Sequence, residues 1–218
     1  MKREMAKNNI TEAVFILDAS GSMHDLKEDT IGGFNSLIEE QKGKDGKVLV
    51  STIVFSDDST VVHDRVEIGE VKKLTEAEYT PCGCTALIDA IGGAVKHISK
   101  VHKYIRPEDV PDSTIFFITT DGMENASHKY SSTEVKKMIE AKKEEGWEFI
   151  FMGANIDSVE TAASFGIGRD RTVNYRNDGR GNAVKFRAMA HVVESVRAGC
   201  AVPESWSKEI EEDFESRK

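Results

Sequence analysis

The chain has 218 residues, of which 39% are apolar and 31% are charged, a composition typical of a globular protein rather than a disordered one. Its formal net charge of −9 argues against nucleic acid as a partner, because proteins that neutralise phosphates usually carry a basic surface. No apolar run approaches the ~20 residues that a membrane-spanning helix needs, and the first residues do not resemble a signal peptide, so we expect a soluble protein without membrane contact.

The three cysteines, Cys82, Cys84 and Cys200, predict a reducing compartment. An odd number cannot pair completely within one chain, and a bridge between residues only two apart would be strained. We therefore expect free thiols and a cytoplasmic location.

Six short runs rich in β-branched and aromatic residues predict strands. Most are continuously apolar, as strands covered on both faces are. The run 59–66 carries more polar residues and follows a short turn, which predicts an antiparallel edge strand made by a hairpin. The predicted strands span residues 13–18, 47–55, 59–66, 113–120, 147–153 and 172–175.

Helical patterns separate these strands, with apolar residues three or four positions apart. Ser131 and Glu134 match a capping box at the start of one helix, and Gly146 is a typical residue just beyond its end. The predicted helices span residues 26–38, 87–98, 131–146, 156–165 and 182–198.

This alternation predicts one α/β domain of the doubly wound class, with a mostly parallel central sheet and helices on both faces. We assign residues 1–9 to an N-terminal extension, 10–199 to the domain and 200–218 to an acidic tail. Trp206, Ile210 and Phe214 lie four apart in this tail, which predicts a short amphipathic helix docked on the domain. A tail that binds a partner is the alternative.

Oxygen-bearing side chains follow the predicted strands, at the sheet edge where doubly wound folds bind ligands. Asp18, Ser20 and Ser22 follow the first strand, Thr85 precedes a helix, and Asp121 follows the strand 113–120. Such hard donors suit Mg²⁺ or Mn²⁺ rather than Zn²⁺. Because only two of them are charged, a bound cation would keep its attraction for an acidic group.

Each of these residues also has a purely structural interpretation. Asp18 or Ser20 could cap a helix at the strand-to-helix turn, and Thr85 could be the N-cap of the helix that follows it. Asp121 could form a turn with Gly122.

The segments "LDASGSM", "CTALIDAI", "ITTDGMENAS" and "GWEFIFMGAN" resemble the small stand-alone von Willebrand factor type A (vWA) domain proteins of bacteria and their phages. The resemblance covers about residues 10–198, including the order of the predicted elements. It implies a Rossmann-like fold and a metal-ion-dependent adhesion site (MIDAS). The cation would usually be Mg²⁺, with Mn²⁺ or Ca²⁺ as alternatives, and the implied ligands, direct or through water, are Asp18, Ser20, Ser22, Thr85 and Asp121.

Two classes of function follow. The resemblance implies a non-catalytic module whose metal binds an Asp or Glu of a protein partner, and bacterial relatives suggest an AAA-type ATPase or a phage or stress-response complex. The alternative is a metal-dependent hydrolase, either a phosphatase or a nuclease. Phosphatases of the haloacid dehalogenase type need a second Asp where this chain has Ser20, and a two-metal nuclease needs more carboxylates. We therefore favour binding.

Other residues near these loops are given simpler roles. Asp89, Glu124 and Asn125 are expected to support the site by hydrogen bonds. Cys82, Cys84 and His24 are interpreted as ordinary loop residues, because no further metal-ligand pattern accompanies them. The basic stretch 169–187 is interpreted as a solvated loop and helix face rather than as an anion site.

Overall fold

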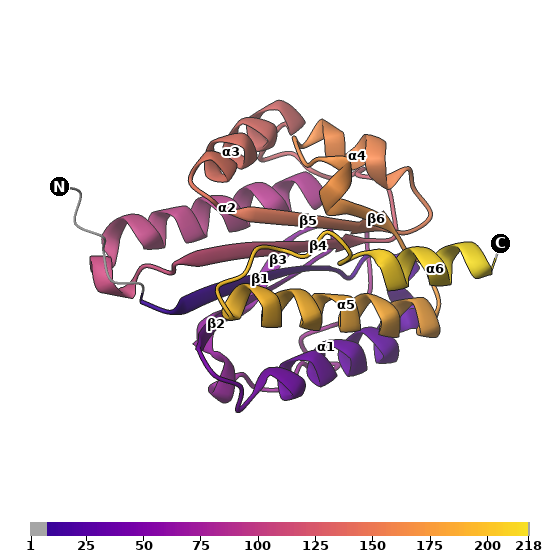
Figure 1. Ribbon diagram of the computed structural model, residues 1–218. Coiled ribbons are helices and arrows are strands. Elements are labelled where there is room, and N and C mark those ends of the chain that lie inside the picture. The colour runs from indigo at the N-terminus through magenta and orange to yellow at the C-terminus, as the bar shows by residue number, and fades with distance from the viewer. Residues whose placement is uncertain (1–7, 218) are drawn as a thin grey trace.

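A six-stranded sheet forms the centre of the computed structural model, which describes residues 8–217 (Figure 1). The strand order is β3-β2-β1-β4-β5-β6, and only the β2–β3 pair is antiparallel. The predicted fold class, a mostly parallel sheet with one antiparallel edge strand, is confirmed. The strands are β1 (Ile10–Asp18), β2 (Lys47–Phe55), β3 (Ser59–Glu67), β4 (Ser113–Thr120), β5 (Glu148–Gly153) and β6 (Thr172–Asn174).

Helices cover both faces of this sheet: α2, α3 and α4 lie on one side, and α1, α5 and α6 on the other (Figure 1). Within residues 8–217, none of them has the length and apolar character needed to cross a membrane. The helices are α1 (Lys27–Gln41), α2 (Leu87–Tyr104), α3 (Ser132–Glu144), α4 (Ser158–Ser164), α5 (Gly179–Arg197) and α6 (Lys208–Ser216). Short 3₁₀ turns span Gly21–Leu26, Ile68–Glu70, Pro107–Asp109 and Arg169–Arg171.

The two central strands, β1 and β4, are apolar on both faces because a helical layer packs on each. Phe15 of β1 stacks on Phe117 of β4 with ring centroids 5.2 Å apart, and meets the edge of Phe34 of α1 at 5.5 Å. Leu17 is the register partner of Thr119, so these parallel strands end side by side. The loops that follow Asp18 and Thr120 therefore start at the same edge of the sheet.

Strand β1 begins at Ile10, three residues before the predicted start at residue 13, and includes a charged residue. Glu12 is fully buried and accepts hydrogen bonds from Arg65 Nε at 2.9 Å and His102 Nε2 at 2.5 Å. A carboxylate can lie in a sheet interior when a guanidinium and further hydrogen-bond donors compensate for its lost hydration. Because Arg65 and His102 are distant from Glu12 in the sequence, the residues around Glu12 did not indicate that β1 starts at Ile10.

The acidic tail folds back on the domain, where α6 packs against α5 and β6. Trp206, just ahead of α6, and Ile210 within it are both buried. The basic stretch 169–187 supplies its partners: Arg180 Nε lies 2.7 Å from Asp213, and Arg176 donates to the carbonyl of Phe214. The interpretation of this stretch as a solvated loop and helix face holds for Arg169, Arg180 and Arg187, which are exposed, but not for Lys185, which is buried. Of the N-terminal extension predicted for residues 1–9, residues 1–7 lie outside the described part of the chain.

Helix α5 also begins earlier than predicted, at Gly179 rather than at residue 182. Asp178 caps it by accepting a hydrogen bond from the N–H of Gly181 at 2.8 Å. Asp is among the residues that cap helices most effectively, and its cap lets two glycines occupy the first turn.

We expect Gly33→Ala to lower the free energy of unfolding by about 1–3 kcal/mol, because it overpacks the contact between α1 and α5. A Cβ on Gly33 would come within 2.9 Å of Phe186 Cε2 and closer still to Cδ2. The matched control is Gly32→Ala, where a Cβ meets nothing within 4 Å and where alanine should stabilise the helix by up to about 1 kcal/mol. Urea unfolding of both variants measures the difference, and equal midpoints would show that Phe186 yields without cost.

Candidate metal centre

Two buried aspartates stand at the carboxyl ends of the central strands. Asp18 ends β1 and is 1% exposed, while Asp121 directly follows β4 and is 3% exposed. Ser22 Oγ donates to Asp121 Oδ1 at 2.6 Å and lies 3.1 Å from Ser20 Oγ. The structure thus brings four of the five predicted ligands into one hydrogen-bonded group.

The Asp18 carboxylate is held through both of its oxygens. Oδ1 accepts from the N–H of Ser20 at 2.7 Å, and Oδ2 accepts from Thr120 Oγ1 at 2.6 Å. Burial raises the pKa of Asp18 above its ordinary value, against the effect of these hydrogen bonds, and the nearby charge of Asp121 adds to the rise. A cation at this point would relieve both the lost hydration and the repulsion between the two carboxylates.

Thr85, the fifth predicted residue, faces the same group from the loop before α2. A Cβ on Gly122 would lie 3.5 Å from Thr85 Oγ1, so the hydroxyl faces the loop that carries Asp121. The backbone holds it there, since Thr85 N–H donates to Asn125 Oδ1 at 2.9 Å and Asn125 N–H donates to the Thr85 carbonyl at 3.1 Å. Gly21 N–H also donates to the Gly83 carbonyl at 3.1 Å, which joins the first loop to the second.

The purely structural interpretations of Ser20, Thr85 and Asp121 are wrong. Ser20 stands at the N-cap of a 3₁₀ turn, but its side chain makes no capping hydrogen bond. The N-cap of α2 is Ala86 rather than Thr85. The Asp121 oxygens accept from Ser22 and Asn177, whereas the N–H of Gly122 donates to Thr120 Oγ1. Only Asp18 serves the local backbone, through the hydrogen bond that its Oδ1 accepts from the N–H of Ser20.

The three residues expected to support the site do so by binding backbone N–H groups. Glu124 accepts from Ile88 N–H at 2.8 Å in the first turn of α2. Asp89 accepts from the N–H groups of residues 128–130, and Asn125 holds Thr85 as described. Together they tie the loop after Asp121 to the start of α2.

Sequence reasoning missed several residues that contact the aspartates. Tyr79 is fully buried and donates its hydroxyl to the Asp18 carbonyl at 2.5 Å. Asn177 Nδ2 donates to Asp121 Oδ2 at 3.0 Å, and its Oδ1 is buried without a hydrogen-bond partner among residues 8–217. Both come from irregular segments without a motif, so no sequence signal marked them. Thr120, beside Asp121, was the one residue that its position could have indicated.

A buried lysine lies close to the site as well. Lys185 of α5 is 1% exposed, and its Nζ lies 4.3 Å from the ring centroid of Tyr175. Burial lowers the pKa of Lys185 to about 7, although the charges of Asp121 and Asp18 favour its protonated form. No ion pair of Lys185 with a carboxylate occurs in the described part of the chain. When protonated, Lys185 is therefore stabilised only at longer range, by the two site aspartates.

The remaining side chains around the loops face solvent. Ser22 is exposed, the His24 side chain is 79% exposed, and Cys82 and Cys84 are exposed free thiols. A hydrogen bond with Asp57 raises the pKa of the Cys84 thiol, which disfavours a thiolate. No cluster of three or more His, Cys, Asp or Glu side chains suited to a metal occurs between residues 8 and 217. Two carboxylates with three hydroxyls thus remain as the donor set.

This donor set fits a hard divalent cation. The two carboxylates match its charge, the hydroxyls are neutral oxygen ligands, and soft sulfur or imidazole donors are not part of the group. Buried carboxylates that repel each other have the electrostatic character of a cation site.

Comparisons with known proteins show the fold. No protein-family model and no curated protein matches the chain. Among solved structures, the vWF domain of the type V pili tip protein Mfa5 from Porphyromonas gingivalis is 8% identical, with a TM-score of 0.60, over 84% of this chain and 95% of that one. Manganese-loaded TRAP protein from Plasmodium vivax is 17% identical, with a TM-score of 0.55, over 83% and 74%.

A third similar structure is proximal thread matrix protein 1 from the mussel byssus, with a zinc-occupied MIDAS motif. It is 16% identical, with a TM-score of 0.52, over 87% of this chain but only 46% of the mussel protein. The present chain therefore spans less than half of that relative. The sheet order, the antiparallel edge strand and these similarities together show that the chain has the Rossmann-like α/β fold of a vWA domain.

Proposed function

We propose that the chain is a non-catalytic, metal-dependent protein-binding module. A divalent cation would be held by Asp18, Ser20, Ser22, Thr85 and Asp121, in the manner of a MIDAS, and would capture an acidic side chain of a partner. One observation carries this proposal: three loops gather two buried carboxylates and three hydroxyls at one sheet edge, with Ser22 on the exposed side.

When bound, the cation supplies positive charge that attracts a carboxylate. The residues of the chain determine how much of that charge remains. Asp18 and Asp121 would neutralise the cation, while Thr120 and Asn177 already donate to one oxygen of each and so hold both carboxylates in place. Because the further ligands would be neutral hydroxyls, the site would carry no excess negative charge to repel an incoming Asp or Glu, which could take an open position on the cation.

We propose Mg²⁺ as the cation, because an all-oxygen donor set with few anions suits it. Mn²⁺ and Ca²⁺ are the alternatives to test. For the partner, we propose a cytoplasmic protein that presents Asp or Glu, such as an AAA-type ATPase or a phage or stress-response complex. The negative net charge of the chain makes nucleic acid a poor candidate.

Capture of the partner from a lysate should occur in Mg²⁺ and be lost in EDTA. Thr85→Ala should weaken capture strongly, because it removes a buried hydroxyl that faces the loop of Asp121 and is one of the proposed ligands. The matched control is Thr60→Ala, an exposed threonine on β3. Binding that is indifferent both to EDTA and to Thr85→Ala would refute a metal-mediated contact.

The competing function, metal-dependent hydrolysis, has its own readout. Turnover of a phosphate monoester or of DNA in Mg²⁺, abolished by Asp18→Asn, would replace the binding proposal with a hydrolase. Absence of turnover together with EDTA-sensitive capture would support the binding module.

A further inference from the structure

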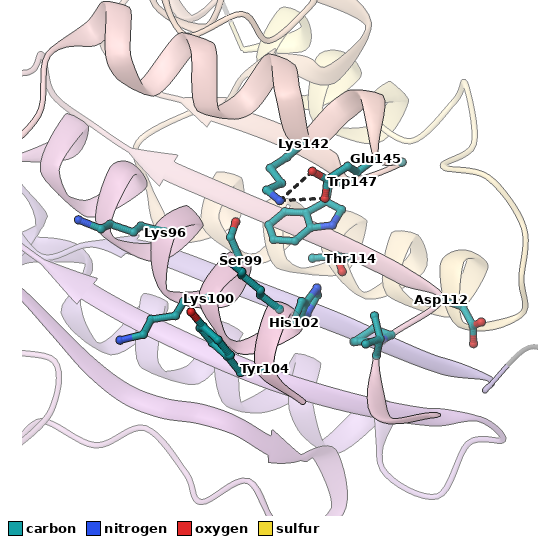
Figure 2. Close-up of a pocket in the computed structure, with 14 residues that line it drawn as sticks. Lys96, Ser99, Lys100, His102, Tyr104, Asp112, Thr114, Lys142, Glu145 and Trp147 are labelled. Carbon is teal, nitrogen blue, oxygen red and sulfur yellow. Dashed lines mark hydrogen bonds and ion pairs between the residues drawn. The ribbon is translucent and has the colours of Figure 1, made fainter. Parts of the chain in front are cut away.

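A cavity lies at the edge of the sheet opposite the candidate metal centre. Its volume is 730 Å³, within the range of small-molecule sites, and it lies beside the starts of β4 and β5 and the last turns of α2 and α3. Figure 2 shows Trp147 and His102 with Lys142 beside them, whereas Lys96 and Lys100 lie farther out, with their amino groups directed away from the Trp147 ring and Lys100 next to Tyr104. No residue of the metal centre takes part in it.

The cavity is basic, although the chain as a whole is acidic. Four lysines line it, and one of them, Lys142, is paired with Glu145 at 2.8 Å. The other lining acid, Asp112, accepts from the backbone N–H groups of Asn8 and Ile10, both at 3.2 Å. Three lysines therefore remain without an ion pair among residues 8–217: Lys96, Lys100 and Lys103.

Aromatic rings and one hydroxyl without a hydrogen-bond partner also line the cavity. Trp147 is held between Lys142, whose Nζ lies 5.0 Å from its ring centroid, and the His102 ring at 5.2 Å. Tyr104 is 72% exposed at the cavity, an unusual position for a large ring. Ser99 Oγ is buried without a hydrogen-bond partner within the described residues. The cavity is thus lined by cationic and aromatic side chains, and the Ser99 hydroxyl can form one further hydrogen bond.

The walls of the cavity are also fixed in place. His102 Nε2 bonds to the buried Glu12 at 2.5 Å, and Arg65 binds the other oxygen of that carboxylate. Trp147 is only 8% exposed and stacks on Phe116 with centroids 5.5 Å apart. A site whose rings are already ordered loses little conformational entropy when a ligand binds.

We propose that this cavity is a second ligand site, which binds a nucleotide independently of the metal centre. The unpaired lysines would attract the phosphate groups, and the exposed ring of Tyr104 would receive the planar base. The volume suits one nucleotide rather than a polymer, and the net charge of −9 disfavours a nucleic-acid strand.

The test is calorimetric titration of the full chain with ATP in EDTA, which keeps metal-mediated binding at Asp18 and Asp121 out of the measurement. We expect saturable binding, about tenfold weaker in Lys96→Ala/Lys100→Ala, since hydrogen bonds to charged groups are strong. Both lysines are exposed, so the variant should fold. Lys137→Ala, an exposed lysine outside the cavity, is the matched control and should bind like the wild type.

Titrations with two further ligands measure the contributions of the phosphates and of the base separately. Pyrophosphate carries the charge without the ring, and adenosine the ring without the charge, so each should bind at least about tenfold more weakly than ATP. Tyr104→Ala, which removes the exposed ring, should weaken ATP binding about tenfold and leave pyrophosphate binding unchanged. No saturable binding, equal affinity in the lysine double variant, loss of binding in Asp18→Asn, or tighter binding of a single-stranded oligonucleotide would each overturn the proposal.

Discussion

Mg²⁺ at 100 times its Kd is expected to raise the melting temperature of the wild-type protein by about 5–10 °C. A ligand that binds only the folded state contributes about 2.7 kcal/mol at that concentration, and about 1 kcal/mol shifts the melting temperature of a chain of this size by about 2–4 °C. Asp18→Asn should abolish the rise, because it removes one of the two carboxylates that would neutralise the cation.

In EDTA the same substitution should have the opposite effect. The Asp18 carboxylate is 1% exposed, burial raises its pKa, and the charge of Asp121 repels it. Asparagine keeps a carbonyl to accept from the N–H of Ser20 but carries no charge, so the metal-free variant should melt at or above the wild-type temperature. A variant that is merely damaged would melt lower under both conditions.

Differential scanning calorimetry with Mg²⁺, Mn²⁺, Ca²⁺ and EDTA measures both effects. Asp64→Asn is the matched control, an exposed aspartate on the edge strand β3, and it should keep the full response to metal. An undiminished Mg²⁺ response in Asp18→Asn would remove this residue from the site.

The second large effect concerns Lys185, whose substitution should change how stability depends on pH. The pKa of Lys185 is lowered to about 7 in the folded protein from its ordinary 10.5. Between these values the unfolded chain binds a proton that the folded chain lacks, so stability rises with pH by about 1.4 kcal/mol per unit. Below pH 7 both states are protonated, and the full cost of burying the charge is present.

Lys185→Met should remove this contribution and stabilise the metal-free protein most at low pH. Urea unfolding in EDTA from pH 6 to 10 gives the comparison, and groups that titrate in both proteins cancel in the difference. Lys137→Met, an exposed lysine on α3, should leave the wild-type slope unchanged. Parallel stability curves for the wild type and Lys185→Met would mean that the buried amine is not destabilised.

Much of the fold could be predicted from the sequence, and so could the location of the candidate ligands at the ends of strands. Both depend on local sequence patterns. Continuous apolar runs distinguish buried parallel strands, and the polar run 59–66 distinguishes the edge strand β3. Asp18 and Asp121 directly follow such runs. Since neighbouring parallel strands end at one edge, their order along the chain was enough to bring them together.

The other contacts of the site depend on packing between distant segments. Lys185 and Arg187 lie in the same basic stretch and look alike in sequence, yet one is buried above Tyr175 and the other pairs with Glu209 on the surface. The rotation of α5 against the sheet and the docking of α6 determine which of the two residues is buried and which is exposed. Asn177 reaches Asp121 from the loop before α5 for the same reason.

The docking of α6 has a practical consequence for every binding measurement. Its end holds the loop that carries Asn177, since Arg176 donates to the Phe214 carbonyl and Arg217 pairs with Asp178 at 2.5 Å. Strand β1, in contrast, starts at the far edge of the sheet from the three loops (Figure 1). A purification tag or surface anchor attached after α6 would crowd the loop on Asp121, whereas one attached ahead of β1 would present the oxygen-lined edge freely to a partner.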